Sequence, residues 1–428
     1  MSLYLQGYSK VAQCIQLSTI SILSLIPIVG HTSSEELEIQ KLRDEVKELR
    51  KIMENQVITF QKIQNLDTLK ERKKSDNRTQ NSDQNATAID KSQIKFYGFF
   101  RADAAYQFKG GNAIFNRINK VDLEGNEIHK DQLSTTIATT RLGIDFKNIS
   151  LNESVDGKLE IDFRGGSEND SVRIRHAYLN YGDWLFGQTT SNFLATEFIP
   201  EIVDFGSPAG VGTLRTPMVR YSHKNNSKIQ TSIAIEQGRN TNRIPTITAK
   251  TKFSFARDRG TLAIRGLIQE LRDPLANEKA FSWGTALGAN FNFTDDFSIK
   301  VDYSHVKGDD RFMLFTNTAY NISSNNELNL NEFDSFVLGA NYKFSQKLRS
   351  TVGYGAIIAN NNNSYAKQVR IDNDSNQNKN IRQGWLNIMY SPAQYLTFGL
   401  EYIYGKRQNY LGQAGSDNRI ETMIRYDF

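Results

Sequence analysis

The sequence contains one cysteine, Cys14, and only seven prolines among its 428 residues. A single cysteine excludes a disulfide within the chain, which suits an exported protein without disulfides. Hydrophobic residues make up 39% of the chain and the mean hydropathy is −0.51, which excludes a bundle of transmembrane helices. The net charge of +5 is modest, and no contiguous basic tract suggests nucleic-acid binding. Few prolines together with 29 glycines fit an all-β chain with many turns.

The last ten residues alternate between two kinds of side chain. One stripe is apolar (Ile420, Ile424, Tyr426 and Phe428), and the other is charged (Arg419, Glu421, Arg425 and Asp427). A strand between lipid and water has this pattern, and its terminal aromatic residues belong at the membrane interface. Soluble sheets also alternate, but they rarely end on an exposed aromatic. A C-terminal strand that ends in Tyr426 and Phe428 resembles the assembly signal of bacterial outer-membrane barrels, which implies the barrel-assembly machinery as a partner.

The first thirty residues read as a secretory signal peptide. Lys10 precedes an apolar stretch over residues 11–30, and small residues follow between Gly30 and Ser34. We therefore expect a signal peptide over residues 1–30, with cleavage between 30 and 34. A membrane-anchoring helix is the alternative, which Pro27 and the polar interruptions weaken. Cys14 follows a glutamine and too little apolar sequence to form a good lipoprotein box, so the mature chain would be free of cysteine.

Residues 35–66 contain no glycine or proline and show a heptad pattern. Apolar residues alternate three- and four-residue spacings at Ile39, Leu42, Val46, Leu49, Met53, Phe60 and Ile63, with Gln56 at the remaining core position. The pattern predicts a short coiled-coil helix, because the chain offers no helical partner of its own. A single amphipathic helix on the surface of the same chain is the alternative. Residues 67–92 are polar and unpatterned, which predicts a flexible linker.

From Gln93 onward the period changes to two. Lys158, Glu160, Asp162 and Arg164 alternate with Leu159, Ile161 and Phe163, and about sixteen segments behave in this way. Tyr97 and Phe99 break the alternation in the first of them. Tight turns and long loops separate the segments alternately, as in outer-membrane barrels. Residues 93–428 are therefore expected to form an all-β transmembrane barrel of about sixteen antiparallel strands, wide enough for a water-filled lumen.

Arginines dominate the inward phase of the first third of the barrel. They are Arg101, Arg141, Arg164, Arg173, Arg175 and Arg220, with Arg215 close by although Pro217 obscures its phase. Guanidinium groups gathered in a narrow lumen concentrate anions and bind carboxylate or phosphate in a bidentate manner. The alternative is that they pair with acids such as Glu160 and Asp162 and brace the wall.

The segment 188–214 does not alternate and is rich in proline, glycine and phenylalanine. An apolar segment of this length makes a poor exposed loop, so we expect it to fold into the barrel and narrow it. Its acids, Glu197, Glu201 and Asp204, would then face the arginine wall and set up a transverse field. An external loop that packs on itself is the alternative.

Several motifs resemble the DcaP-like porins. These are Phe186–Phe193, Asp204–Gly210, Arg220-Tyr221 and Gly399–Arg407, together with the heptad segment before the barrel. Thr190 departs from the pattern, which has a tryptophan there. The resemblance implies a homotrimeric, sixteen-stranded channel in the outer membrane of a Gram-negative bacterium, with a periplasmic coiled coil. It also implies contact with outer-membrane lipid and lipopolysaccharide, and passage of small, preferentially anionic solutes such as dicarboxylates.

Signals for catalysis are weak, so we expect a porin rather than an enzyme, with no cofactor and no metal. None of the five histidines has a metal-binding spacing, and His176 and His305 fall on the outward phase or near the membrane interface. Trp184, Trp283 and Trp385 lie near strand ends, where interfacial aromatics belong. Two rival functions are a barrel-borne outer-membrane hydrolase, although no nucleophile elbow is present, and a structural or adhesive barrel.

Overall fold

The computed structural model describes residues 91–115, 117–149, 154–166 and 170–428. They belong to one compact unit, Thr87–Phe428. The predicted signal peptide (1–30), the coiled-coil helix (35–66) and nearly all of the linker (67–92) lie outside the described residues. Among the described residues, no helix is long and apolar enough to cross a membrane.

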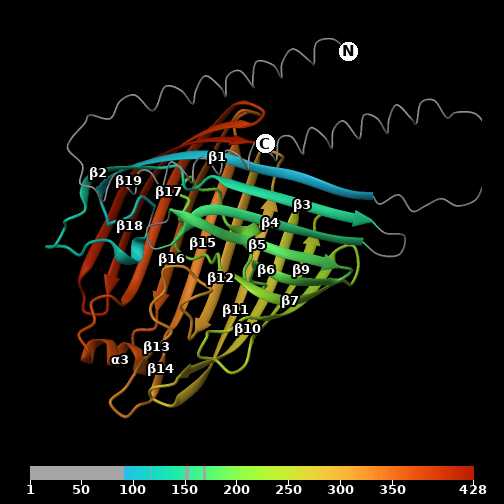
Figure 1. The fold of residues 1–428 in the computed structure, drawn as a ribbon. Coiled ribbons are helices and arrows are strands. Elements are labelled where there is room, and N and C mark those ends of the chain that lie inside the picture. The colour runs from blue at the N-terminus through green and yellow to red at the C-terminus, as the bar shows by residue number, and fades with distance from the viewer. Residues whose placement is uncertain (1–90, 116, 150–153, 167–169) are drawn as a thin grey trace, which may run out of the picture. The chain divides into compact units, whose positions relative to one another are not determined.

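The described residues form one sheet of seventeen strands that closes on itself (Figure 1). The strands are β1 (Lys91–Lys109), β2 (Lys130–Thr136), β3 (Arg141–Ile149), β4 (Ser154–Gly165), β5 (Ser171–Tyr181), β6 (Trp184–Thr190), β7 (Arg215–Lys224), β8 (Ile229–Glu236), β9 (Thr246–Phe255), β10 (Gly260–Asp273), β11 (Glu278–Asn292), β12 (Phe297–Lys307), β15 (Glu332–Lys343), β16 (Leu348–Ala359), β17 (Asn378–Ala393), β18 (Leu396–Asn409) and β19 (Ala414–Asp427). β2 and β3 pair with successive parts of β1, so together they occupy one strand position in the barrel. The result is a sixteen-stranded antiparallel barrel, which confirms the predicted fold.

The connections differ between the two ends of the barrel. At one end, which we call the turn end, short turns such as 182–183, 256–259, 293–296 and 344–347 join the strands. At the other, which we call the loop end, the long connections 110–129, 191–214, 308–331 and 360–377 emerge. They carry η1 (Ile118–Lys120), η2 (Thr196–Phe198), the hairpin β13 (Tyr320–Ile322) and β14 (Leu328–Leu330), and α3 (Ser364–Ile371). This asymmetry is typical of outer-membrane barrels.

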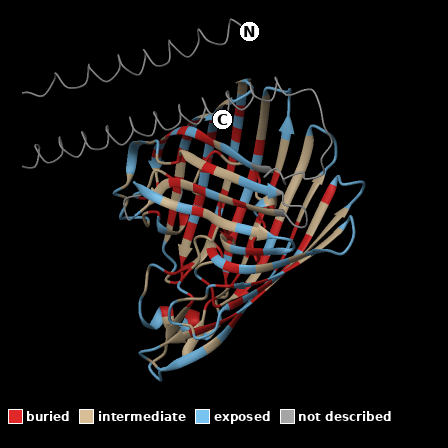
Figure 2. Cartoon of the chain, turned by 45° about the vertical axis from the view of Figure 1, so that its right-hand side comes forward, coloured by how far each residue is buried: buried red, intermediate tan, exposed pale blue. Residues whose placement is uncertain are grey.

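Burial alternates along the strands as the period of two predicts. On β18, Leu400 and Tyr402 are exposed on the outer face, while Glu401 and Ile403 are buried inside. Figure 2 shows the same alternation of buried and exposed bands on neighbouring strands. The outer face of the barrel is therefore apolar, whereas the inner face carries both polar side chains such as Glu401 and buried apolar ones such as Ile403.

Three aromatic residues lie inside the barrel for identifiable reasons. The Tyr97 hydroxyl donates to Glu160 at 2.9 Å, and the Phe99 ring lies beneath the Arg425 guanidinium at 4.1 Å. Both exceptions to the alternation are thus lumen residues with polar or cationic partners. Trp385 was expected at the membrane interface, but that expectation was wrong. It is 3% exposed on the inward face of β17, where its indole N–H donates to the Glu201 carbonyl at 3.1 Å.

The barrel closes where β1 meets β19. The backbone N–H of Phe428 donates to the Gly98 carbonyl at 3.1 Å, and the Gly98 N–H donates back at 3.2 Å. The Phe428 ring also packs on Phe100, with 5.2 Å between centroids. A Cβ atom at Gly98 would lie 2.4 Å from the Arg141 carbonyl oxygen, so only glycine allows this approach. The C-terminal strand and its terminal aromatic therefore complete the ring.

We predict that Phe428→Ala lowers the folded fraction and the thermal midpoint of the barrel. The change removes an aromatic pair worth about 0.5–1.5 kcal/mol at the one seam between the two ends of the sheet. The heat-modifiable band on cold SDS gels measures the folded fraction. Phe344→Ala is the matched control, because Phe344 is an exposed aromatic at the turn end that packs on Tyr342, away from the seam. Equal losses in both variants would contradict the prediction.

Candidate functional site

The connection between β6 and β7, residues 191–214, lies inside the barrel, while residues 188–190 complete β6. We call residues 191–214 the inner loop. Its side chains Phe193, Phe198 and Ala209 are buried. At its start, the Asn192 N–H donates to the Glu236 carboxylate of β8 at 2.7 Å. The loop is therefore packed as part of the interior.

The middle of the inner loop is held by inward side chains of β17 and β18. The two oxygens of Glu401 accept the backbone N–H groups of Val203 and Asp204, each at 2.9 Å. Asn387 donates to the Glu201 carbonyl at 3.0 Å and to Glu401 at 2.9 Å. A buried backbone needs such partners because no water is there to bond its polar groups.

Cationic side chains on the wall formed by β9, β10 and β12 hold the loop carbonyls. The bonds run from Lys250 to the Leu194 oxygen (2.6 Å), from Arg265 to the Phe193 oxygen (3.1 Å) and from Lys300 to the Ile199 oxygen (3.1 Å). These three cationic side chains therefore hydrogen-bond the backbone of the inner loop and hold it against this wall.

Two glycines allow the loop to touch the wall of β15 and β16. A Cβ atom at Gly355 would lie 2.0 Å from the Ala209 carbonyl oxygen. A Cβ atom at Gly339 would lie 2.3 Å from the Pro200 side chain. Any larger residue at either position would push the inner loop away from this wall.

On its other side, the inner loop borders a cavity of about 480 Å³, which we call the arginine cavity. Its basic lining residues are Arg101, Arg117, Lys120, Arg141, Arg164, Arg173, Arg175 and Arg215. Among the described residues, Asp204 is the one acid in the lining, and Phe115, Ile202, Phe205, Leu314 and Phe315 supply the apolar part. Six of the seven arginines singled out from the sequence therefore converge here. Arg220, on β7, does not line the cavity.

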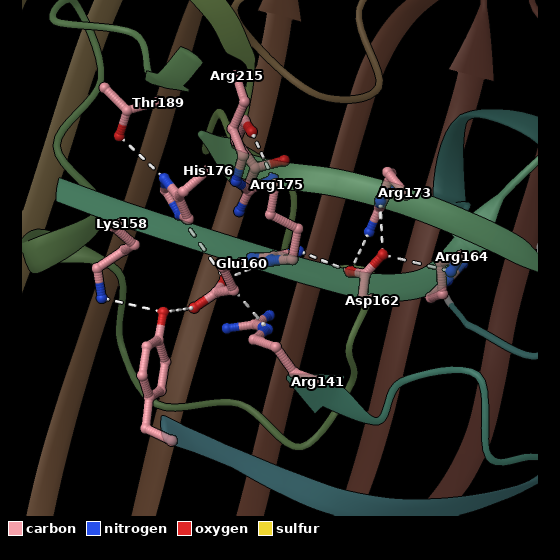
Figure 3. Close-up of polar contacts among 12 residues, drawn as sticks. Arg141, Lys158, Glu160, Asp162, Arg164, Arg173, Arg175, His176, Thr189 and Arg215 are labelled. Atoms are coloured by element: carbon pink, nitrogen blue, oxygen red, sulfur yellow. Dashed lines mark hydrogen bonds and ion pairs between the residues drawn. The ribbon is translucent and has the colours of Figure 1, made fainter. Parts of the chain in front are cut away.

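Some of these arginines are already paired with acids of the wall (Figure 3). Arg173 binds Asp162 through two nitrogens, at 2.8 and 2.6 Å, and Arg175 reaches Glu160 at 2.8 Å and Asp162 at 2.9 Å. Arg141 is looser, at 3.4 Å from Glu160. Arg173 and Arg175 therefore brace the barrel wall through their salt bridges with Glu160 and Asp162.

Two other arginines of the arginine cavity, Arg164 and Arg215, differ from Arg173 and Arg175 in their contacts. Arg164 and Arg215 form no salt bridge with any described residue, although both lie beside the paired group (Figure 3), where the Arg164 backbone N–H donates to Asp162 at 3.3 Å. The Arg164 guanidinium lies over the rings of Phe115 and Phe205, at 4.5 and 5.5 Å. A guanidinium stacked on an aromatic ring keeps its N–H groups free at the edges. These two arginines are the natural contacts for an anion.

The loop acids are placed differently from the expectation. Asp204 lines the arginine cavity, but Glu197 pairs with Lys252 at 3.1 Å and Glu201 pairs with Arg349 at 2.8 Å. Both partners belong to the opposite wall, because the side of the inner loop that carries Glu197 and Glu201 faces β9–β16. Of the three loop acids that the sequence placed opposite the arginines, only Asp204 borders the arginine cavity. The other loop residues that line this cavity are Ile202, Phe205, Gly206, Ser207 and Thr213.

The connection 110–129 contributes two cations that periodicity could not reveal. Arg117 and Lys120 reach the arginine cavity from this loop, which has no alternation to place them. Asp122 stabilises the loop by accepting the N–H groups of Ile128 and His129, each at 2.7 Å. Burial alone would raise the pKa of the Asp122 carboxyl, but its hydrogen bonds with His129 and Ile128 hold it below its ordinary value. This anchor therefore persists at neutral and mildly acidic pH, and it is lost only as the pH falls through that lowered value.

A β-bulge corrects the expected direction of His176. The register shifts between Glu160 and Ile161, so that Arg175 is an extra residue on β5. Arg175 and His176 consequently both point inward, and His176 contacts the Thr189 hydroxyl at 2.9 Å (Figure 3). The alternation of the sequence could not reveal the inserted residue.

Comparison with known proteins places the chain among outer-membrane channels. The model of the DcaP outer membrane protein family matches residues 30–428. The outer membrane channel DcaP of Acinetobacter baumannii is 36% identical, with a TM-score of 0.74 over 79% of this chain and 97% of that one.

More distant structures share the fold. An anion-selective porin from Comamonas acidovorans is 13% identical, with a TM-score of 0.55 over 79% of this chain and 100% of that one. OmpF of Salmonella typhi is 11% identical, with a TM-score of 0.53 over 78% and 97%. No curated protein matches the sequence.

We predict that Gly355→Val displaces the inner loop from its wall. The added side chain would collide with the Ala209 carbonyl, and overpacking of this kind costs about 1–3 kcal/mol. Faster backbone hydrogen exchange over residues 199–212 and a lower thermal midpoint would report the displacement. Gly266→Val is the matched control, because a Cβ atom there has its nearest neighbour at 3.8 Å. Unchanged exchange in Gly355→Val would rule the displacement out.

Proposed function

This chain belongs to the DcaP outer membrane protein family, and we propose that it is a porin through which small hydrophilic solutes diffuse passively, with a preference for anions such as dicarboxylates. The family and the barrel place it in the bacterial outer membrane. The turn end would then face the periplasm and the loop end the exterior.

The arginine cavity carries the proposal of anion preference. Eight basic side chains and Asp204 line a space of about 480 Å³. Same-sign charges in a cleft with low-dielectric walls raise the local concentration of counter-ions. Arg164 and Arg215, which form no salt bridge among the described residues, would contact carboxylates in a bidentate manner. The apolar side, with Ile202 and Phe205, would accept the carbon part of such a solute.

The rival functions find less support. The ring nitrogens of His129, His176, His223 and His305 contact Asp122, Thr189, Asp183 and Asp334 respectively, whereas a hydrolase with a Ser–His–acid triad would require a serine hydroxyl at one of these nitrogens. Within the described residues, no group of three or more His, Cys, Asp or Glu could hold a metal ion. A purely structural barrel would not require a cation-lined cavity beside a packed inner loop.

The assembly and the partners belong to the same proposal. A homotrimer held in part by a periplasmic coiled coil over residues 35–66 is supported by the heptads and by the family resemblance. The exposed apolar outer face suits outer-membrane lipid and lipopolysaccharide. The seam at Phe428 suits recognition by the barrel-assembly machinery.

We predict that wild-type protein gives conductance steps in planar bilayers and an anion-selective reversal potential in a KCl gradient. The double variant Arg164→Gln/Arg215→Gln should lower the anion-to-cation permeability ratio about twofold or more, because it removes two of the eight basic side chains of the arginine cavity, neither of which forms a salt bridge among the described residues. Arg175→Gln should instead destabilise the barrel by about 3 kcal/mol, because Glu160 and Asp162 lose a partner.

The control for selectivity is Arg382→Gln/Lys406→Gln. These paired residues of β17 and β18 are exposed on the outer face, so the variant removes the same charge outside the lumen. A barrel that gives no conductance steps would refute the porin proposal. Cation selectivity of the wild type would refute the anion preference alone.

We also predict that Leu42→Asp/Leu49→Asp lowers the temperature at which the oligomer dissociates on semi-native gels. Both residues occupy predicted core positions of the heptads, where a carboxylate disrupts packing. The heat-modifiable band of the barrel itself should not change. Lys41→Asp/Lys47→Asp, at predicted outer positions of the heptads, should leave dissociation close to the wild type. If both pairs behaved alike, the coiled coil would not hold the oligomer.

A further inference from the structure

A second cavity lies on the other side of the inner loop, towards the turn end. It measures about 440 Å³ and is lined by Pro200 and Glu201 of the loop and by residues of β12, β15 and β16. Pro200 and Glu201 border this second cavity, whereas Ile202 and Asp204 border the arginine cavity. A few consecutive residues of the inner loop therefore form the partition between two lumen cavities.

The second cavity is also cationic. Lys300, Lys343 and Arg349 line it, and Glu201 is its one acid among the described residues. Lys300 donates one hydrogen bond to the Ile199 carbonyl at 3.1 Å, and Lys343 lies 3.4 Å from the Asp295 carbonyl. An ammonium group has three donors, so each lysine keeps donors for a ligand. The side chains of Asn341 and Thr351 add neutral polar groups.

Glu201 occupies the strongest anion contact of this cavity. Its carboxylate binds Arg349 through two nitrogens, with Nε to Oε2 at 2.8 Å and a terminal nitrogen to Oε1 at 2.9 Å. This is the bidentate geometry by which arginine binds free carboxylates. The carboxylate is attached to the partition, at the border of the cavity, where an entering anion would compete with it.

We propose that Lys300, Lys343 and Arg349 form a second anion-binding site, on the turn-end side of the inner loop, for carboxylate or phosphate groups. The inference rests on the proposed porin function and adds to it a separate site. Glu201 holds Arg349 in the empty site and weakens the affinity for the ligand, because an entering anion must displace it or bind beside it. Anions would thus meet one basic site on each side of the partition.

Block of single channels by inorganic triphosphate tests the proposal with the full chain. Triphosphate is added to each compartment in turn. From one side, the block should weaken about tenfold in Lys300→Gln/Lys343→Gln, since charge-assisted contacts are lost. From the other side, the block should respond instead to Arg164→Gln/Arg215→Gln. Glu201→Gln should strengthen the first block about tenfold, because it removes the competing charge.

Lys347→Gln is the matched control, because this exposed lysine lies in the turn after β15 and does not line the cavity. If Lys347→Gln weakened the block as much as Lys300→Gln/Lys343→Gln, or if Glu201→Gln did not strengthen it, the second site would be refuted. Conductance steps test the porin function separately. Should the protein form no channel, calorimetric titration of triphosphate into the solubilised full chain must still rank the variants in the same order for the site to stand.

Discussion

Closure of the sheet between β1 and β19 is the constraint on which the rest of the structure depends. A bilayer offers no water to an unpaired backbone group, so the first and last strands must bond to each other. The reciprocal bonds between Gly98 and Phe428 provide this at the turn end. Once the ring is closed, every strand has one face towards lipid and one towards the lumen. The alternation of the sequence, the buried charges and the inner loop all follow from that division.

The inner loop brings backbone polar groups into the interior, and they must be satisfied there as well. Glu401 accepts loop N–H groups, and Lys250, Arg265 and Lys300 donate to loop carbonyls. Many of the lumen charges therefore hold the loop and are not displayed to solutes. These partners lie on β9, β10, β12 and β18. From the arginine wall, Arg101 of β1 also donates to the Val203 carbonyl, and Phe205 of the loop lies against Arg101 and Arg164.

The arginines of the arginine cavity differ in whether they form salt bridges with acids of the wall. Arg173 and Arg175 share Glu160 and Asp162, so their removal would leave buried carboxylates without partners. Arg164 and Arg215 add charge to the same cavity without a salt bridge to a described residue. A site built in this way keeps a rigid cationic wall and still presents free donors. The second cavity repeats the arrangement, with Arg349 held by Glu201 beside Lys300 and Lys343.

The sequence by itself determined the barrel, its sixteen strands, the two faces of each strand and the arginines of the first third, because a period of two is a local property that each residue carries in its own position. The tertiary structure decided what periodicity does not encode. The bulge at Arg175 turned His176 inward, and the packing of the loop on β9–β16 directed Glu197 and Glu201 to Lys252 and Arg349. Arg117, Lys120 and the indole of Trp385 likewise acquired their partners from segments distant in the chain. Such contacts depend on register and on which wall a buried loop can reach, and both are settled only when the sheet has closed.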